Sequence, residues 1–178
     1  MPVLPYCQSI HSFAIFELFK KIYPDWSYSE CKKMAYDEKN SIHLLTLVAF
    51  SNNLAVGQMN VFRVGPNCEL GNIGYHVHPD WQRKCIASLL LFKTWGEIKN
   101  KFSDGFIVQT SLDNIPSINF ATKYGFKKTP GKILDEYSDY LKFKKIKRGI
   151  SYHLSIMNDR ANKELEKCAR IGAIKLGG

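Results

Sequence analysis

The feature that most constrains this sequence is a junction at Pro79, where a strand pattern stops and a helical pattern begins. The strand pattern covers residues 70–77, and a long amphipathic helix is predicted from Gln82. Its apolar positions are Cys85, Leu89, Phe92, Trp95, Ile98 and Phe102. The first N–H groups of a helix lack intrahelical partners, and the helix dipole adds partial positive charge there. The junction is therefore predicted to hold an anionic group such as a pyrophosphate, with Arg83 and Lys84 adding positive charge.

The segment before this junction is predicted to form two helices and a strand hairpin. Apolar aromatic residues recur at helical spacing at Phe13, Phe16, Phe19 and Tyr23. Ser27 followed by Glu30 is a capping box for a second helix that runs to Tyr36. Residues 42–50 and 54–63 are rich in strand formers and are separated by a Ser-Asn-Asn turn, which predicts an antiparallel hairpin.

The segment after the long helix completes an α/β order of elements. Because a strand–helix–strand unit packs as a right-handed crossover, residues 70–77 and 106–110 are predicted to be parallel strands of one sheet. A short helix should follow, with Pro116 in its first turn and Gly125 as its C-terminal left-handed residue. A final strand or pair of strands is expected within residues 126–145.

Two segments of this sequence carry short motifs. Residues 82–87, Gln-Arg-Lys-Cys-Ile-Ala, follow Val-His-Pro at 77–79 and are similar to the acyl-CoA signature Gln/Arg-x-x-Gly-x-Gly/Ala of the GNAT N-acetyltransferase superfamily. Cys85 stands in place of the first glycine. Residues 114–126, with an asparagine, a short helix and a closing Gly-Phe, resemble a later family motif. The resemblance covers residues 10–147.

The resemblance implies a fold and a reaction. The fold is a mixed, mostly antiparallel central sheet with one parallel crossover, in which two central strands splay apart after a bulge and the pantetheine arm of the ligand lies between them. The reaction is transfer of the acetyl group of acetyl-CoA to a primary amine of a small molecule or peptide by direct attack. The implied acetyl-CoA-binding residues are Val77, Gln82, Arg83, Lys84, Cys85, Ile86, Ala87, Ser88, Asn114 and Ser117.

The catalytic acid and base are less well defined. In many family members a tyrosine seven residues after the motif asparagine serves as the acid, and that position is Ala121 here. Tyr124, one helical turn further on, is a candidate acid, or else it packs against the sheet beside Phe126. Candidate bases are Glu69, Tyr75, His76 and His78. Strand alternation puts Glu69 and Tyr75 on one face and His76 and His78 on the other if no bulge intervenes, and His76 and Glu69 are the predicted catalytic residues among them. The alternatives are a packed or solvated polar histidine and a solvated carboxylate.

Cys85 has two interpretations at the level of sequence. Its backbone is expected to be helical, so a Cβ is tolerated, although the sulfur could crowd a phosphate. A thiol at a helix N-terminus beside Arg83 and Lys84 should favour its thiolate form. Alternatively, Cys85 is a small buried apolar side chain on the inner face of the helix.

Composition favours a single globular domain in the cytoplasm. The chain has 178 residues, of which 45% are hydrophobic and 23% charged. Its N-terminus lacks the pattern of a signal peptide, and no apolar segment approaches the ~20 residues that span a bilayer. The five cysteines have no zinc-binding spacing, so reduced thiols and no metal are expected. Residues 148–178 are expected to be a C-terminal extension to a domain of residues 1–147, packed on the domain or on a homodimer partner.

A net charge of +9 indicates an anionic partner. Lys127, Lys128 and the basic residues within 142–148 form either the solvated side of a terminal strand or a surface for a CoA 3′-phosphate or nucleic acid. No zinc-finger or helix-turn-helix pattern supports nucleic-acid binding. Two functions stay open beside the transferase: a catalytically weak acyl-CoA-binding or regulatory module, suggested by Cys85 and Ala121, and a basic nucleic-acid-binding protein.

Overall fold

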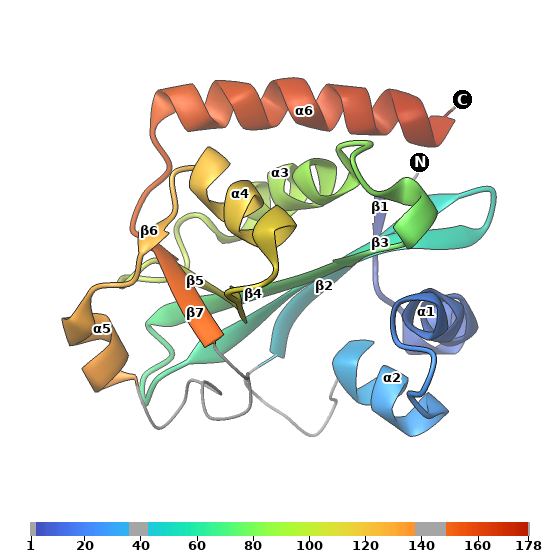
Figure 1. Cartoon of the computed structure of the whole chain (residues 1–178), viewed down its shortest axis with the longest axis horizontal. Coiled ribbons are helices and arrows are strands. Elements are labelled where there is room, and N and C mark those ends of the chain that lie inside the picture. Colours follow the sequence, from blue (N-terminus) through green and yellow to red (C-terminus); the bar gives the residue numbers. More distant parts are fainter. Residues whose placement is uncertain (1–2, 36–42, 138–148, 178) are drawn as a thin grey trace.

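The computed structural model describes residues 3–35, 43–137 and 149–177, and within them a seven-stranded sheet is flanked by helices (Figure 1). The strands are β1 (Val3–Pro5), β2 (His43–Ser51), β3 (Leu54–Val64), β4 (Leu70–Val77), β5 (Phe106–Ser111), β6 (Lys127–Lys128) and β7 (Gly149–Leu154). The helices are α1 (Gln8–Ile22), α2 (Tyr28–Ala35), α3 (Ile86–Ile98), α4 (Ile115–Lys123), α5 (Gly131–Glu136) and α6 (Asp159–Gly177), with a 3₁₀ turn, η1, at Pro79–Trp81.

The sheet is mixed and mostly antiparallel. Its strand order is β1-β2-β3-β4-β5-β7-β6. Strands β4 and β5 are parallel neighbours, whereas the other paired strands run antiparallel. The long crossover between β4 and β5 contains α3. The predicted fold class, with one parallel crossover in a mostly antiparallel sheet, is therefore confirmed.

Helices cover both faces of the sheet (Figure 1). Helix α1 packs on one face through Ile15, Leu18 and Phe19, and α5 lies toward the other end of that face, against Val64 and Ile107. Helices α3 and α4 lie on the opposite face, and α6 packs on α3 as a further layer. The main apolar core is enclosed between the sheet, α3 and α6.

Local sequence signals account for several turns. Asn52 and Asn53 both have positive φ, +46° and +67°, as a two-residue hairpin turn requires. At the predicted capping box, the Ser27 N–H donates to Glu30 Oε2 at 2.7 Å and the Glu30 N–H donates to Ser27 Oγ at 3.3 Å. Gly125 has φ +87°, as expected for the residue that ends α4. These predictions are confirmed.

Helix α3 is covered on two sides. The predicted helix from Gln82 through Phe102 is shorter in the structure, where it begins at Ile86 and ends at Ile98. Ile86 lies against β3, where a Cβ on Gly57 would come within 2.9 Å of it. Leu89 lies against α6, where a Cβ on Gly172 would come within 3.1 Å of it. Because α6 buries the outer side, the apolar residues of α3 need not keep to one stripe.

The C-terminal residues belong to the same folded body as the rest. Strand β7 is hydrogen-bonded between β5 and β6, with Ile107 paired to His153, and α6 packs on α3. Residues 149–177 thus pack on the rest of the described chain, and the division after residue 147 stays a prediction. Of the expected strand or pair within residues 126–145, the described part contains β6, followed by α5, and residues 138–145 lie outside the described residues. The last described strand is β7.

The pairing of β4 with β5 ends early. Gly71 pairs with Phe106 and Asn72 pairs with Ile107, and no further pairs follow along the two strands. On its other side β4 pairs with β3 in unbroken register from Leu70 to Val77. The two strands therefore separate beyond Asn72 and Ile107, as the family resemblance implies, and we call this separation the splay. The implied bulge is absent from the β3–β4 pairing.

The contact between α6 and α3 can be tested with a matched pair of glycine substitutions. A Cβ at Gly172 would lie 2.7 Å from the Cys85 carbonyl oxygen, whereas a Cβ at Gly96 would meet nothing within 4 Å. Both positions are helical, so alanine improves helix propensity equally. We expect Gly172→Ala to lower the free energy of unfolding by about 1–3 kcal/mol. Gly96→Ala should raise it by about 1 kcal/mol in the same denaturant titration. A stabilising Gly172→Ala would contradict this packing.

Candidate active site

The loop between η1 and α3 contains two residues in the left-handed conformation. Arg83 has φ +58° and Cys85 has φ +61°, and both follow the extended residue Gln82. Left-handed residues in such a loop turn successive N–H groups toward the same side, which makes a concave anion-binding nest. Arg83, Lys84 and Cys85 therefore form a nest at the start of α3, where the helix dipole is positive.

The N–H groups of this nest are available. Within the described ranges, no hydrogen bond uses the N–H groups of residues 83–88, and the first intrahelical bond runs from the Leu89 N–H to the Cys85 carbonyl at 2.9 Å. Arg83 and Lys84 are exposed, and Lys84 Nζ lies 4.7 Å from the centre of the Trp81 ring. Free donors, partial positive charge and two cations together suit a diphosphate.

Main-chain groups of β4 face β5 without strand partners beyond Asn72. The His78 N–H donates to the Val56 carbonyl at 2.9 Å on the β3 side, and the Gly71 N–H donates to the Gly105 carbonyl at 3.0 Å on the β5 side. Even-numbered residues of β4 thus pair with β3, and odd-numbered residues face β5. The N–H groups of Tyr75 and Val77 consequently point toward the splay.

A side-chain bridge crosses from β4 to α4 beside these groups. The Tyr75 hydroxyl donates to Ser117 Oγ at 2.9 Å, and the Tyr75 ring packs on Phe120 with ring centres 4.7 Å apart. The Ser117 N–H in turn donates to Asn114 Oδ1 at 3.2 Å, which caps α4. Asn114 and Ser117, predicted to bind the ligand, therefore lie at the α4 turn that faces β4. Tyr75 was considered in the sequence only as a candidate base, and its contact with Ser117 was not predicted, because the two residues lie 42 positions apart.

His76 lies on the opposite face of the sheet, against α1. Its ring meets Phe19 edge-on at 4.9 Å and Tyr23 at 5.8 Å between ring centres. Its Nδ1 atom is buried without a hydrogen-bond partner. Burial lowers the pKa of His76 to about 4, so the imidazole is neutral at physiological pH. A neutral imidazole can accept a hydrogen bond here, but it is a weak proton acceptor.

Neutral polar side chains surround His76 on that face. Asn72 Nδ2 donates to Gln109 Oε1 at 3.2 Å across the splay, while Gln109 Nε2 is buried without a partner. On β3, Gln58 Nε2 donates to Asn60 Oδ1 at 2.6 Å. Strand alternation places these four residues on the same face as His76. We call Gln58, Asn60, Asn72, His76 and Gln109 the polar floor.

Glu69 lies at the other end of β4. Its carboxylate accepts a hydrogen bond from the Asn67 N–H at 3.3 Å. At about 3.3 Å per strand residue, Glu69 is roughly 23 Å from His76 along the strand. The structure therefore does not bring Glu69 together with His76.

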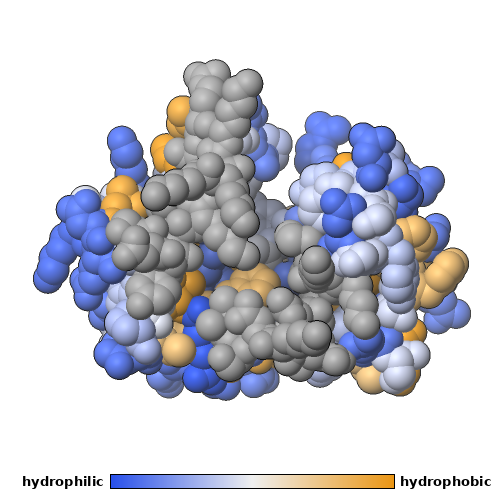
Figure 2. Space-filling view, turned by 90° about the horizontal axis from the view of Figure 1, so that it is seen from below, coloured by the Kyte–Doolittle hydropathy of each residue, from blue (hydrophilic) through white to orange (hydrophobic). Residues whose placement is uncertain are grey.

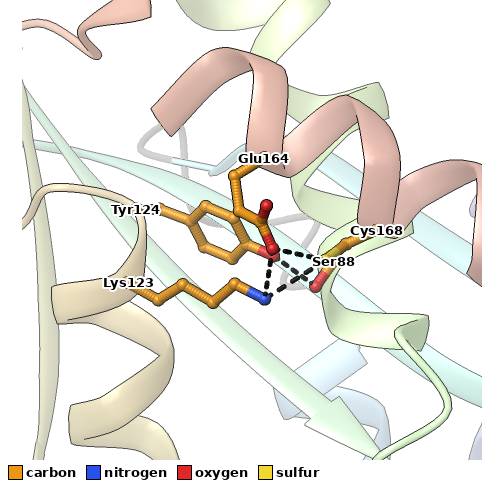
Figure 3. A network of polar contacts seen from close by, with 5 residues as sticks. All are labelled: Ser88, Lys123, Tyr124, Glu164 and Cys168. Atoms are coloured by element: carbon orange, nitrogen blue, oxygen red, sulfur yellow. Dashed lines mark hydrogen bonds and ion pairs between the residues drawn. The ribbon is translucent and has the colours of Figure 1, made fainter. Parts of the chain in front are cut away.

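Tyr124 is enclosed in a network that joins α3, α4 and α6 (Figure 3). Its hydroxyl donates to Ser88 Oγ at 2.7 Å, and burial raises its pKa to about 12. Beside it, Lys123 Nζ lies 3.0 Å from Glu164 Oε1 and 3.2 Å from Cys168 Sγ. Tyr124 is fully buried and lies across the sheet from His76. The three predicted catalytic side chains, Tyr124, His76 and Glu69, thus occupy three separate places.

A hollow of about 930 Å³ lies between α4 and α6, behind this network. Its lining includes Lys123, Arg160, Lys163, Lys167 and Glu164, but no residue of β4 or β5. It is therefore separate from the nest and the splay. The predicted basic residues 142–148 lie outside the described residues.

Other surface features are less distinctive. Seen from below, the described side chains in view are mostly hydrophilic, with hydrophobic ones in separate small groups (Figure 2). In the described parts of the chain, no group of three or more His, Cys, Asp and Glu residues is arranged to hold a metal ion. No helix among the described residues has the length and apolarity needed to cross a membrane.

Comparison with protein-family profiles gives one match, which spans both the central strands and the loop that contains the nest. The acetyltransferase (GNAT) family profile matches residues 13–126, which include β4, the nest, α3 and α4. This chain belongs to the GNAT family. Comparison with curated proteins gives no match.

Solved GNAT structures resemble the chain in fold at low sequence identity. The GNAT domain of S. lividans PAT has a TM-score of 0.66 at 12% identity and covers 85% of this chain and 88% of its own. The ribosomal-protein-S18-alanine N-acetyltransferase of Escherichia coli has a TM-score of 0.63 at 14% identity, covering 88% and 94%. A Brucella melitensis GNAT acetyltransferase in complex with acetyl-CoA has a TM-score of 0.54 at 14% identity, covering 70% and 81%.

Cys85 occupies the position of the first GNAT motif glycine, and the structure gives the reason that glycine suits it. The expectation of helical backbone at Cys85 is wrong, because its φ of +61° and ψ of 17° are left-handed. A side chain in this conformation costs about 1–2 kcal/mol. The expectation of a favoured thiolate is also wrong. Burial, together with the neighbouring Cys168, raises the pKa of the Cys85 thiol despite the nearby Lys123.

The left-handed backbone can be tested by comparing Cys85→Gly with Cys85→Ala. Both variants remove the sulfur, but only glycine removes the Cβ from a left-handed residue. We expect the glycine variant to be more stable than the alanine variant by about 1 kcal/mol in denaturant unfolding. In an ordinary helical residue the sign would be reversed. An alanine variant of equal or greater stability would therefore rule out the left-handed loop.

The burial of His76 predicts a specific acid sensitivity. Its folded pKa of about 4 lies below the unfolded value of 6.5, so the unfolded chain binds more protons as the pH falls between these values. Stability present above pH 6.5 is therefore lost toward pH 4, by up to about 3 kcal/mol. We expect His76→Gln to remove this part of the pH dependence of unfolding. Burial also lowers the pKa of His11, but His11 is present in both the wild type and the His76→Gln variant, so its effect cancels in the comparison. Parallel curves for the two proteins would refute a buried neutral His76.

Proposed function

We propose that this chain transfers the acetyl group of acetyl-CoA to a primary amine of a small molecule or peptide by direct attack. The observation that carries the proposal is the nest at Arg83, Lys84 and Cys85, with unused N–H groups directly beside the splay of β4 and β5. Membership of the GNAT family supports it, as does the acetyl-CoA complex of the Brucella melitensis relative. A peptide acceptor finds support in the Escherichia coli relative, whose name specifies an alanine of a ribosomal protein.

Acetyl-CoA fits the two adjoining features as one extended ligand. Its diphosphate would bind the N–H groups of residues 83–88, with Arg83 and Lys84 neutralising its charge. Its pantetheine arm would lie along the unpaired main chain of β4, opposite the α4 turn that carries Asn114 and Ser117. The N–H groups of Tyr75 and Val77 would then polarise the thioester carbonyl.

The amine would approach from the face of the polar floor. This floor contains amides and a neutral imidazole, with no carboxylate among its five residues, so it suits a single amine better than a polycation. His76 would accept a hydrogen bond from the amine rather than take its proton, because its pKa is too low for efficient proton removal. The amine therefore attacks as the free base. Glu69 is too distant to assist His76, and Tyr124 is enclosed.

The proposal predicts thiol release from acetyl-CoA with one or more members of a panel of small amines, amino acids and peptides. Calorimetric titration with acetyl-CoA should show binding by the same protein. Binding without turnover would instead support an acyl-CoA-binding or regulatory module. Absence of both would overturn the transferase and leave the basic nucleic-acid-binding protein to be tested.

Two substitutions that change the net charge equally test where the diphosphate binds. Ala87→Glu introduces a carboxylate in the first turn of α3, where it favours the helix but repels a bound diphosphate. Lys93→Gln lowers the net charge by the same amount at the exposed middle of α3. We expect Ala87→Glu to weaken acetyl-CoA binding at least about tenfold and Lys93→Gln to change it little. Equal effects would mean that acetyl-CoA senses only overall charge.

A further inference from the structure

Among the described tyrosines, only Tyr75 lies on β4 beyond the end of its pairing with β5. It belongs to β4, three residues beyond Asn72, where the pairing with β5 ends. Its N–H faces the splay, and its side chain crosses to α4 on the same side of the sheet as α3. Its hydroxyl reaches Ser117 at 2.9 Å, while its ring is held by Phe120.

Tyr75 also differs from the nearby Tyr124 in access. Tyr124 is fully buried and its hydroxyl is held by Ser88 between α3 and α4. Tyr75 is only partly buried, and its hydroxyl has one hydrogen bond, to the small rotatable side chain of Ser117. Rotation of that serine or of the phenolic O–H frees the Tyr75 hydroxyl at a partly exposed position, whereas the Tyr124 hydroxyl stays inside the core.

We propose that the Tyr75 hydroxyl exchanges Ser117 for the sulfur of acetyl-CoA and stabilises the thiolate as it leaves. The inference rests on the proposed function, which places the thioester beside the N–H groups of Tyr75 and Val77. The nitrogen of the amine forms a bond to the acetyl carbon, the carbon–sulfur bond breaks, and its electron pair stays on sulfur. The phenol donates a hydrogen bond to that sulfur. The amide product releases its extra proton to solvent, and the thiolate takes up a proton from solvent.

Proton transfer from Tyr75 is not needed in this step and would be unfavourable. Burial raises the pKa of Tyr75 to about 12, whereas an ordinary thiol has a pKa of about 8.5. A phenol that is the weaker acid keeps its proton and acts as a hydrogen-bond donor. Donors of this kind, fixed where negative charge develops, contribute to rate without a change in their own protonation.

The experiment compares the full-length protein with Tyr75→Phe. We expect kcat to fall by about tenfold to hundredfold, with acetyl-CoA affinity changed less than about threefold. Because the phenol stays protonated, the wild-type rate should show no decline due to tyrosine ionisation up to pH 10. In the complex with free CoA, thiolate absorbance in the ultraviolet should appear at lower pH for wild type than for Tyr75→Phe. A purely structural tyrosine would not shift that titration.

Two further variants separate this role from packing. Tyr137→Phe makes the same chemical change in a buried tyrosine that donates to Asp104 at the other end of the sheet, and it should leave kcat and the CoA thiol titration unchanged. Ser117→Ala removes the same hydrogen bond as Tyr75→Phe but keeps the phenol, so its kcat should fall less. Equal losses in Tyr75→Phe and Ser117→Ala, or full activity of Tyr75→Phe in an active wild-type background, would overturn the role of Tyr75 alone. A wild type that neither binds nor uses acetyl-CoA would overturn the proposed function together with it.

Discussion

The early end of the β4–β5 pairing is the constraint on which the rest of the site depends. At the closed end, Gly71 leaves room for the rings of Phe102 and Phe106, which come within 3 Å of the position that a Cβ would take. These aromatic rings pack edge-to-face and hold the two strands together. Beyond Asn72 the pairing of the two strands does not continue, and a side-chain hydrogen bond from Asn72 to Gln109 spans them there. An aromatic anchor at one end thus permits unpaired main chain at the other.

The position of α3 makes this open end chemically useful. Helix α3 follows β4 through η1 and the nest, so its free N–H groups come soon after the unpaired N–H groups of β4 along the chain. Helix α6 then fixes α3 from outside through the close approach of Gly172 to Cys85. The partly exposed ion pair of Lys123 with Glu164 contributes little by comparison, since solvent screens such pairs. Packing of apolar and small residues, rather than charge, therefore determines where the nest lies.

Sequence patterns predicted the framework of this site but not its side-chain contacts. The bounds of β4, the hairpin turn and the cap of α2 follow from local periodicity and turn chemistry, and the structure confirms them. Strand alternation also separated Tyr75 from His76 correctly, because the register of β3 with β4 is unbroken. The left-handed Cys85 was missed because cysteine carries no local signal for positive φ. The bridge to Ser117 was missed because it depends on how distant segments pack.

The ionisation of the two best-placed side chains gives the site its character. Burial lowers the pKa of His76 to about 4 and raises that of Tyr75 to about 12, so the same physical cause keeps both groups neutral over the ordinary pH range. The polar floor adds only amides to them. A site built from neutral donors and acceptors positions its reactants without exchanging protons with them. Its rate should then follow the fraction of acceptor present as free amine, which makes the acceptor's own basicity the main determinant of activity at a given pH.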